Sequence, residues 1–115
     1  MYTFTCSYKI QADVSKNRMY CIMKGLLIDE YVHRVVRKIR EEANKLSSGF
    51  DVISDTRELK PGTARDAGRI RDAQQYMVDK GVNRFVCVGD TGSEELYLKT
   101  KYSVSSLEEA EEILN

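Results

Sequence analysis

The stretch VISDTRELKPGTARDAGRI, residues 52–70, contains the junction that decides the fold class of this protein. It begins with an apolar run that ends at Asp55 and continues through a polar segment that holds the only proline of the chain, Pro61. From Thr63 onward the pattern is helical. A short apolar strand, a loop and a helix form the repeating unit of α/β domains. The same junction could bind a ligand, accept a phosphate or serve only as the start of a helix, and these alternatives are compared below.

The residues before this junction predict an antiparallel hairpin and a helix. Apolar and small polar residues alternate over residues 2–10, which is the period of a strand. A turn cluster at residues 13–17 leads to a second apolar strand over residues 18–28, in which Gly25 indicates a bulge or a bend. Asp29 then caps a helix with an apolar stripe over residues 32–46, and we expect Gly49 to be its C-cap. The charged residues predicted to face water on this helix are Arg34, Arg37, Lys38, Arg40, Glu41 and Glu42.

The residues around and after the junction predict strands that alternate with helices. Residues 50–54 form a short strand, and a helix runs from Thr63 to about Lys80, where Gly81 ends it. Residues 84–89 are almost continuously apolar, as a central parallel strand requires. A short helix around residues 94–99 and a strand at residues 101–104 follow. The apolar positions expected to face the core on the two later helices are Ala67, Ile70, Ala73, Met77, Val78, Leu107, Ala110, Ile113 and Leu114, and Ser105 with Glu108 fits a capping box.

This order of elements predicts one α/β domain over residues 1–115. Right-handed crossovers make the later strands parallel, so we expect a mixed sheet of about five strands with an N-terminal antiparallel hairpin and about four helices. The chain has 115 residues, of which 42% are hydrophobic and 31% charged, and this composition is typical of one globular domain.

Composition also excludes several classes of function. The formal net charge is zero, which argues against nucleic acid as a partner. No segment approaches the roughly 20 apolar residues that span a bilayer, so we expect no membrane insertion and a cytoplasmic protein. Cys6, Cys21 and Cys87 are widely spaced, which predicts reduced thiols, and neither they nor His33 predict a metal site. We expect no cofactor.

The element order resembles that of the STAS domain, the fold of anti-sigma factor antagonists, and is similar above all to its divergent relatives. The residues that carry the resemblance are KGLLIDEYVHRVVRKI, VISDTRELKPGTARDAG and SVSSLEEAEEIL, and it extends over nearly the whole chain. Antagonists of this kind have a phosphorylatable serine at the start of the helix after the third strand. Here that region reads Gly62-Thr63-Ala64-Arg65, so serine is missing and Thr63 is the hydroxyl near that place.

Thr63 therefore has two interpretations. Thr63 and Asp66 fit a capping pattern, in which the hydroxyl accepts from a backbone N–H and stabilises the helix by roughly 1 kcal/mol. Thr63 is also the candidate phosphoacceptor, because a phosphate is favourable at a helix N-terminus that has basic neighbours. The two interpretations do not exclude each other.

The segments 55–63 and 89–93 both follow strands, at the edge where open α/β sheets bind ligands. If they converge, they offer an anion or small-ligand site, although Asp55, Glu58 and Asp66 bring opposite charge. Asp-Thr-Gly at residues 90–92 matches the aspartic-protease signature, but that fold is all-β, and a turn is the better interpretation. The candidate ligand residues are Arg57, Lys60, Gly62, Thr63, Arg65, Asp90, Thr91, Gly92 and Ser93.

The functional hypothesis is a non-catalytic regulatory module that binds another protein, as the resemblance implies. The alternative is a protein that binds a small anionic ligand, such as a nucleotide, a phosphate or a lipid, at the two segments above. Catalysis is the weakest hypothesis, because the sequence contains no metal set, no nucleophile with a base and no specific phosphate loop. A further hypothesis is that an exposed edge of the sheet forms a homodimer.

Overall fold

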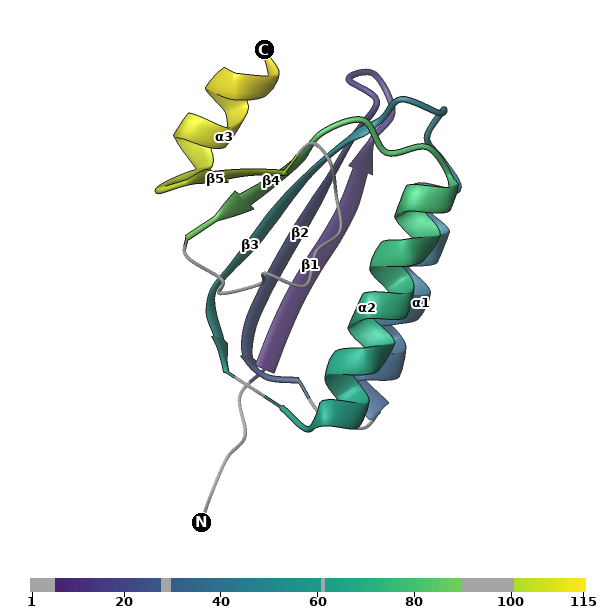
Figure 1. Cartoon of the computed structure of the whole chain (residues 1–115), viewed down its shortest axis with the longest axis vertical. Helices are drawn as coiled ribbons and strands as arrows, with labels where there is room; N and C mark the ends of the chain where they lie inside the picture. The colour runs from purple at the N-terminus through teal and green to yellow at the C-terminus, as the bar shows by residue number, and fades with distance from the viewer. Residues whose placement is uncertain (1–5, 28–29, 61, 90–100) are drawn as a thin grey trace.

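In the described part of the chain, five strands form one sheet and three helices cover its two faces (Figure 1). The structure, a computed structural model, describes residues 6–27, 30–60, 62–89 and 101–115. Strand order across the sheet follows the chain, β1-β2-β3-β4-β5. The elements are β1 (Cys6–Asp13), β2 (Arg18–Leu26), α1 (Glu30–Ala43), β3 (Asp51–Lys60), α2 (Ala64–Asp79), β4 (Phe85–Val88), β5 (Lys101–Val104) and α3 (Leu107–Leu114).

The pairing of the strands confirms the predicted mixed sheet. β1 and β2 form an antiparallel hairpin, and the pairs β2–β3, β3–β4 and β4–β5 are all parallel. The turn between β1 and β2 closes at Asn17, whose φ of 50° is a left-handed conformation that asparagine tolerates. The predicted helix at 94–99, the predicted start of the first strand at residues 2–5 and the predicted cap Asp29 lie outside the described residues.

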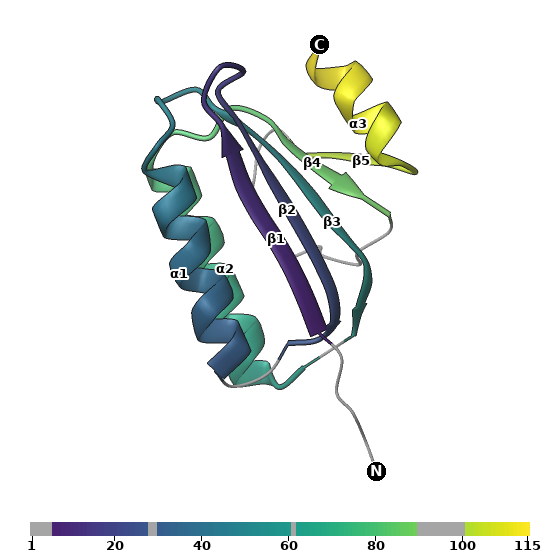
Figure 2. The same cartoon turned by 180° about the vertical axis from the view of Figure 1, so that it is seen from behind.

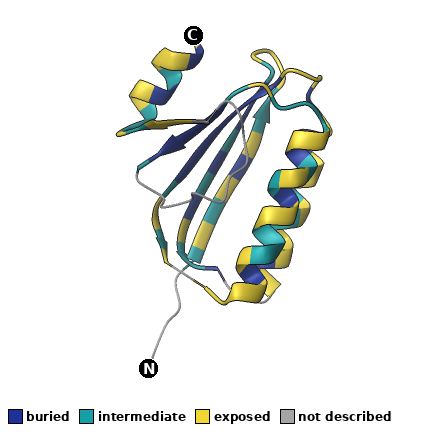
Figure 3. Cartoon of the chain, in the orientation of Figure 1, coloured by how far each residue is buried: buried dark blue, intermediate teal, exposed yellow. Residues whose placement is uncertain are grey.

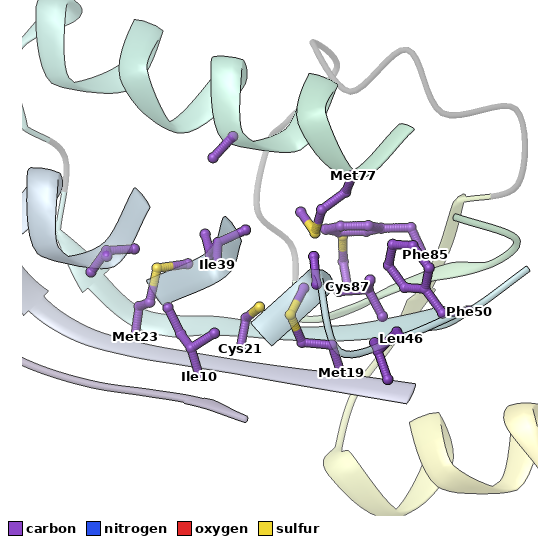
Figure 4. Packing of buried hydrophobic residues seen from close by; sticks show 14 of the residues in the cluster. Ile10, Met19, Cys21, Met23, Ile39, Leu46, Phe50, Met77, Phe85 and Cys87 are labelled. Carbon is purple, nitrogen blue, oxygen red and sulfur yellow. The ribbon is translucent and has the colours of Figure 1, made fainter. Parts of the chain in front are cut away.

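Helices α1 and α2 lie side by side on one face of the sheet and bury the larger core (Figures 1 and 2). Val32, Val35 and Ile39 of α1 are almost completely buried, as the predicted stripe requires. Ala73 and Met77 of α2 meet the same cluster. Figure 4 shows part of this cluster, with Met77 of α2 pointing toward Phe85 of β4. The labelled residues are Ile10, Met19, Cys21, Met23, Ile39, Leu46, Phe50, Met77, Phe85 and Cys87.

Helix α3 lies on the opposite face and buries a much smaller core (Figure 2). Successive residues of a strand point to opposite faces, so the neighbours of the larger-core residues in β3 and β4 face α3. This second cluster consists of Ile53, Val86, Val88, Ala110 and Leu114. Figure 3 shows the result: the central strands are buried, whereas the outward surfaces of all three helices are exposed.

Two arginines hold the C-terminal end of α3. Arg18, only 4% exposed, donates to the carboxylate of Glu111 at 2.8 Å and to the carbonyl of Leu114 at 3.2 Å. Arg84 donates to the carbonyl of Ile113 at 3.2 Å and forms an ion pair with Asp51 at 2.9 Å. Cations at this end satisfy the last carbonyls and oppose the negative end of the helix dipole. Sequence patterns alone do not indicate these contacts, because they join distant parts of the chain; Arg18 and Leu114 are 96 positions apart.

Several predicted positions on the helices are wrong. Glu42 was expected to face water but is buried, because its carboxylate accepts from the backbone N–H of Ala12 on β1 at 3.1 Å. Conversely, Ala67, Val78 and Ile113 were expected in the core and are exposed. Each of the three lies at the border of its apolar stripe, where the packing partner decides the orientation.

Two predicted caps are also wrong. The N-cap of α3 is Ser106, whose hydroxyl accepts from Glu109 N–H, and not Ser105. Gly49 does not cap α1, which ends at Ala43. It has a φ of +88° in the connection to β3, and its N–H donates to the carbonyl of Gly81 at 2.7 Å. The predicted end of α2 is confirmed: Lys80 is the C-cap and Gly81 follows with a φ of +97°.

Candidate functional site

Strand β3 extends much further than the sequence predicted. The expected strand stops at Ser54, whereas β3 continues to Lys60. Lys24, Gly25 and Leu26 at the end of β2 are the reason, because they pair with residues 58–60 and satisfy the backbone of that polar segment. The segment treated as a loop is therefore mostly strand, and the connection to α2 is short.

The extension contains a β-bulge. The pair Ile22 and Asp55 is followed by the pair Lys24 and Glu58, so β3 has one extra residue opposite Met23. A bulge bends its strand and redirects the side chains that follow. Gly25, where the sequence indicated an irregularity, has a φ of 81° and lies just beyond the shift.

Arg57 lies at this bulge and is held by Asp55. Its guanidinium donates to the two carboxylate oxygens of Asp55 at 3.0 and 2.8 Å, and its backbone N–H donates to the same carboxylate at 3.2 Å. Asp55 is 6% exposed. The hydrogen bonds from the Arg57 side chain hold the pKa of Asp55 below its ordinary value, against the effect of burial. Arg57 thus neutralises a buried carboxylate and is not an unpaired cation for a ligand.

Gly89, at the end of β4, lies directly against the Arg57 side chain. Its φ is +91°, and a Cβ atom built there would lie 2.6 Å from Cγ of Arg57. Any other residue would be strained at this φ and would displace the arginine. The structure therefore brings together the end of β4 and Arg57, one part of the predicted convergence.

Thr63 is the N-cap of α2. Its hydroxyl accepts from the N–H of Asp66 at 3.1 Å, which confirms the capping interpretation. Asp66 is 3% exposed and forms an ion pair with Arg69 at 3.3 Å. A carboxylate in the first turn also favours the positive end of the helix dipole.

The start of α2 stands apart from Gly89. From Asp55, which pairs with Val88, β3 continues for five residues to Lys60 before the helix begins, about 17 Å of extended strand. Gly62, Thr63 and Arg65 follow and are exposed. Of the residues predicted to form one anion site, the structure places Arg57 at Gly89 and the others around the helix start. Asp90, Thr91, Gly92 and Ser93 lie outside the described residues.

Ion pairs neutralise most of the basic side chains near the site. Lys24 pairs with Glu58 at 3.2 Å, in addition to the pairs of Arg57 and Arg69. Within the described residues, the exposed cations Lys60 and Arg65 take part in none of the ion pairs. The local positive charge that an anion would meet therefore comes from these two side chains and the N-terminus of α2.

The other chemical candidates do not form a site in the described residues. No group of three or more His, Cys, Asp or Glu side chains lies close enough to hold a metal ion there. His33 is exposed on α1. Burial raises the pKa of the Cys21 thiol to about 12, so this cysteine stays protonated and unreactive at neutral pH. None of the helices in the described ranges is long and apolar enough to cross a membrane.

One hollow in the surface was not expected from the sequence. It has a volume of about 530 Å³ and lies on the face of the β1–β2 hairpin that α1 does not cover. Lys9, Gln11, Tyr20 and Ile22 line it, with the turn that follows Asp13. The alternation of residues along β1 and β2 indicates that Lys9, Gln11, Tyr20 and Ile22 share one face of the hairpin. That this face is left open could not be predicted, because it depends on where α3 packs against the sheet.

Two solved structures are similar to this fold over nearly its full length. One is the anti-sigma factor antagonist SpoIIAA in its unphosphorylated form, with a TM-score of 0.64 and 12% sequence identity; the match covers 93% of this chain and 96% of that one. The other is an anti-sigma factor antagonist from Mycobacterium paratuberculosis, with a TM-score of 0.60 and 10% identity, covering 96% of this chain and 94% of that one. No protein-family model and no curated protein matches the sequence. The STAS-like fold is thus confirmed.

Proposed function

We propose that this chain is a non-catalytic regulatory module that binds another protein through the end of β3 and the start of α2. The observation that carries the proposal is the likeness to two anti-sigma factor antagonists over more than nine-tenths of the chain. Antagonists of this kind act by binding a protein, and the resemblance places their regulated hydroxyl at the start of the helix after the third strand. A cytoplasmic location is part of the same proposal.

The surface proposed for contact is exposed and has a hydroxyl at its centre. Thr63 lies at the N-cap of α2, with Gly62 before it and Arg65 after it, all exposed. A phosphate on Thr63 would add about −1.5 to −2 charge at the positive end of the helix dipole, next to Arg65. It would also remove the hydroxyl from its present contact with Asp66 N–H. Thr63 is therefore the residue that we propose as phosphoacceptor.

The alternative function, binding of a small anion, would use the same helix start with Lys60 and Arg65. The exposed position of both cations favours it. The pairing of Arg57 with Asp55 counts against it, because it removes a cation on which the predicted site depended. A thermal-shift series with phosphate, nucleotides and fatty acids tests it, since a ligand of the folded state raises the melting temperature. Arg65→Ala and Lys60→Ala should abolish any shift caused at this place.

Site-specific photo-crosslinking tests the proposed protein contact. A photoreactive amino acid at Arg65 should form an adduct with a protein of the native cell, identified by mass spectrometry. The same probe at Gln75, an exposed position on the same helix, is the matched control and should form no such adduct. Equal adducts at both positions, or none at position 65, would contradict the proposal.

The structural role of Thr63 has to be separated from a regulatory one. Thr63→Ala removes the cap and should lower the free energy of unfolding by about 1 kcal/mol, whereas Thr63→Ser keeps the hydroxyl and should be close to neutral. Urea unfolding measures both. If the protein contact depends on the hydroxyl and not on stability, Thr63→Ser should retain the adduct at position 65, and Thr63→Glu should change it while the protein stays folded.

A further inference from the structure

We propose that copies of this chain associate head to tail, with the α1–α2 face of one copy against the α3 face of the next. The net charge of the whole chain is zero, but the described charges are not evenly distributed. The two helix layers lie on opposite sides of the sheet (Figure 1). They differ in the sign of their exposed charge. The proposal does not depend on the protein partner proposed above, because the residues that test it lie on α1 and α3 and not at the start of α2.

The outer surface of α1 is mainly basic. Glu42, one of its three glutamates, is buried, and its carboxylate forms ion pairs with Lys38 and Lys45, so it neutralises these two lysines. Glu30 forms an ion pair with Arg34, which leaves Glu41 as the remaining exposed acid of the helix. The basic residues of α1 are Arg34, Arg37, Lys38 and Arg40, of which Arg37 and Arg40 take part in none of the ion pairs among the described residues. Helix α2 adds Arg69, which pairs with Asp66, and Arg71, against exposed Asp72 and Asp79.

This face also has the residue types that dominate protein interfaces. Arg40 lies over the ring of Tyr76 at 5.2 Å, which joins α1 to α2, and Arg34 lies over Tyr31 at 5.5 Å. Stacking on an aromatic ring restricts the arginine side chain, so less conformational entropy is lost when it meets a carboxylate. Arginine and tyrosine are enriched among the residues that contribute most to binding. Tyr31 is 44% exposed, so part of its side chain is accessible to a second copy.

The α3 face has the complementary charge. The whole helix, LEEAEEIL, has no lysine or arginine, and Glu108, Glu109 and Glu112 are exposed. Among the described residues, neither Glu108 nor Glu112 takes part in an ion pair, whereas Glu111 is held by Arg18. Ile113, 37% exposed, gives the same face an apolar side chain. A second copy therefore offers carboxylates where the first copy offers arginines.

The positions of the two faces determine the kind of assembly. Because they lie on opposite sides of the sheet, a contact between them is heterologous and leaves a free face at each end of the pair. Helix α3 has eight residues and is about 12 Å long, so the contact is small and belongs to the weak class. Its main source of energy is charge attraction, which salt screens strongly: the Debye length falls from about 30 Å at 0.01 M to about 3 Å at 1 M.

Sedimentation velocity of the full chain at several ionic strengths is the test. In 0.01 M salt we expect the mean sedimentation coefficient to rise with protein concentration beyond the value for a dimer, and to return to that of a monomer in 1 M salt. Arg37→Glu with Arg40→Glu should weaken the association at least about tenfold, because like charges then oppose each other. Glutamate is as good a helix former as arginine, so this variant should stay folded.

Two further variants distinguish a specific contact from general charge effects. Lys9→Glu with Lys60→Glu makes the same change in net charge on strands β1 and β3, outside the three helices, and should leave the low-salt association within about threefold of the original. A chain with Arg37→Glu, Arg40→Glu, Glu108→Lys and Glu112→Lys exchanges the sign of both faces at an unchanged net charge, and should associate again. Helix content from circular dichroism verifies that α3 is retained. A chain that is monomeric in 0.01 M salt, an equal effect of the Lys9 and Lys60 variant, or no recovery in the exchanged chain would overturn the proposal.

Discussion

The two faces of the sheet are covered in different ways. On one face, α1 and α2 bury a large cluster that includes Met19, Phe50 and Phe85. On the other, α3 contributes Ala110 and Leu114 to a cluster with three strand residues. The first layer is held by apolar burial, whereas the second combines a small apolar contact with hydrogen bonds from Arg18 and Arg84. The comparison indicates that one chain can contain a strongly and a weakly attached layer, and that the weak layer should open first.

The largest loss of stability is expected for Phe50→Ala, which removes a side chain from the larger core. Phe50 is 0% exposed, and its removal leaves a cavity that close-packed neighbours cannot fill. We expect the free energy of unfolding to fall by about 3–5 kcal/mol, a large part of the total for a domain of this size. Urea unfolding followed by circular dichroism measures it. A loss below about 1 kcal/mol would mean that the large cluster does not dominate stability.

A smaller effect, and a local one, is expected for Leu114→Ala in α3. Leu114 is 7% exposed and lies near the chain end, where the structure can relax, so about 2 kcal/mol is expected. Hydrogen exchange should show faster exchange for amides of α3, with protection in α1 and β2 unchanged. If all elements lost protection equally, the two layers would open together and the comparison would be wrong.

The smallest loss of stability is expected for Glu42→Gln, which changes a contact between α1 and the edge strand β1. Burial raises the pKa of this carboxyl, but the contacts with Lys45, the Ala12 N–H and Lys38 outweigh it, so the pKa lies below its ordinary value of 4.5. A lowered pKa contributes stability that is present above pH 4.5 and is lost as the pH falls through the folded pKa. Glu42→Gln should cost roughly 1 kcal/mol at pH 7.

The pH dependence supplies the control for this variant. Urea unfolding between pH 7 and pH 3 should show a weaker loss of stability at acid pH for Glu42→Gln than for the unchanged chain. Glu41→Gln, an exposed neighbour on the same helix, should keep the full pH dependence. The interpretation fails if both variants respond to acid in the same way.

The sequence was sufficient for the order and type of most elements. Local periodicity predicted the hairpin, the stripe of α1 and the bounds of α2, because these depend on neighbours within a few residues. The cap at Thr63 was equally local and is confirmed. The candidate site was predicted in part: Thr63 and Arg65 lie at the helix start as expected, whereas Arg57 is held by a carboxylate that sequence could place nearby but not orient.

Only the tertiary structure decided the features that depend on distant residues. β3 reaches Lys60 because the end of β2 pairs with a polar segment that has no strand signal of its own. Glu42 is buried because β1 presents an N–H to it, and Arg18 finds its partners at the far end of the chain. Sequence by itself determined what can form within one turn or one strand, where the free energy comes from local contacts. Pairing between strands, and the ion pairs that hold α3, gain their free energy from groups that meet only after the chain has folded.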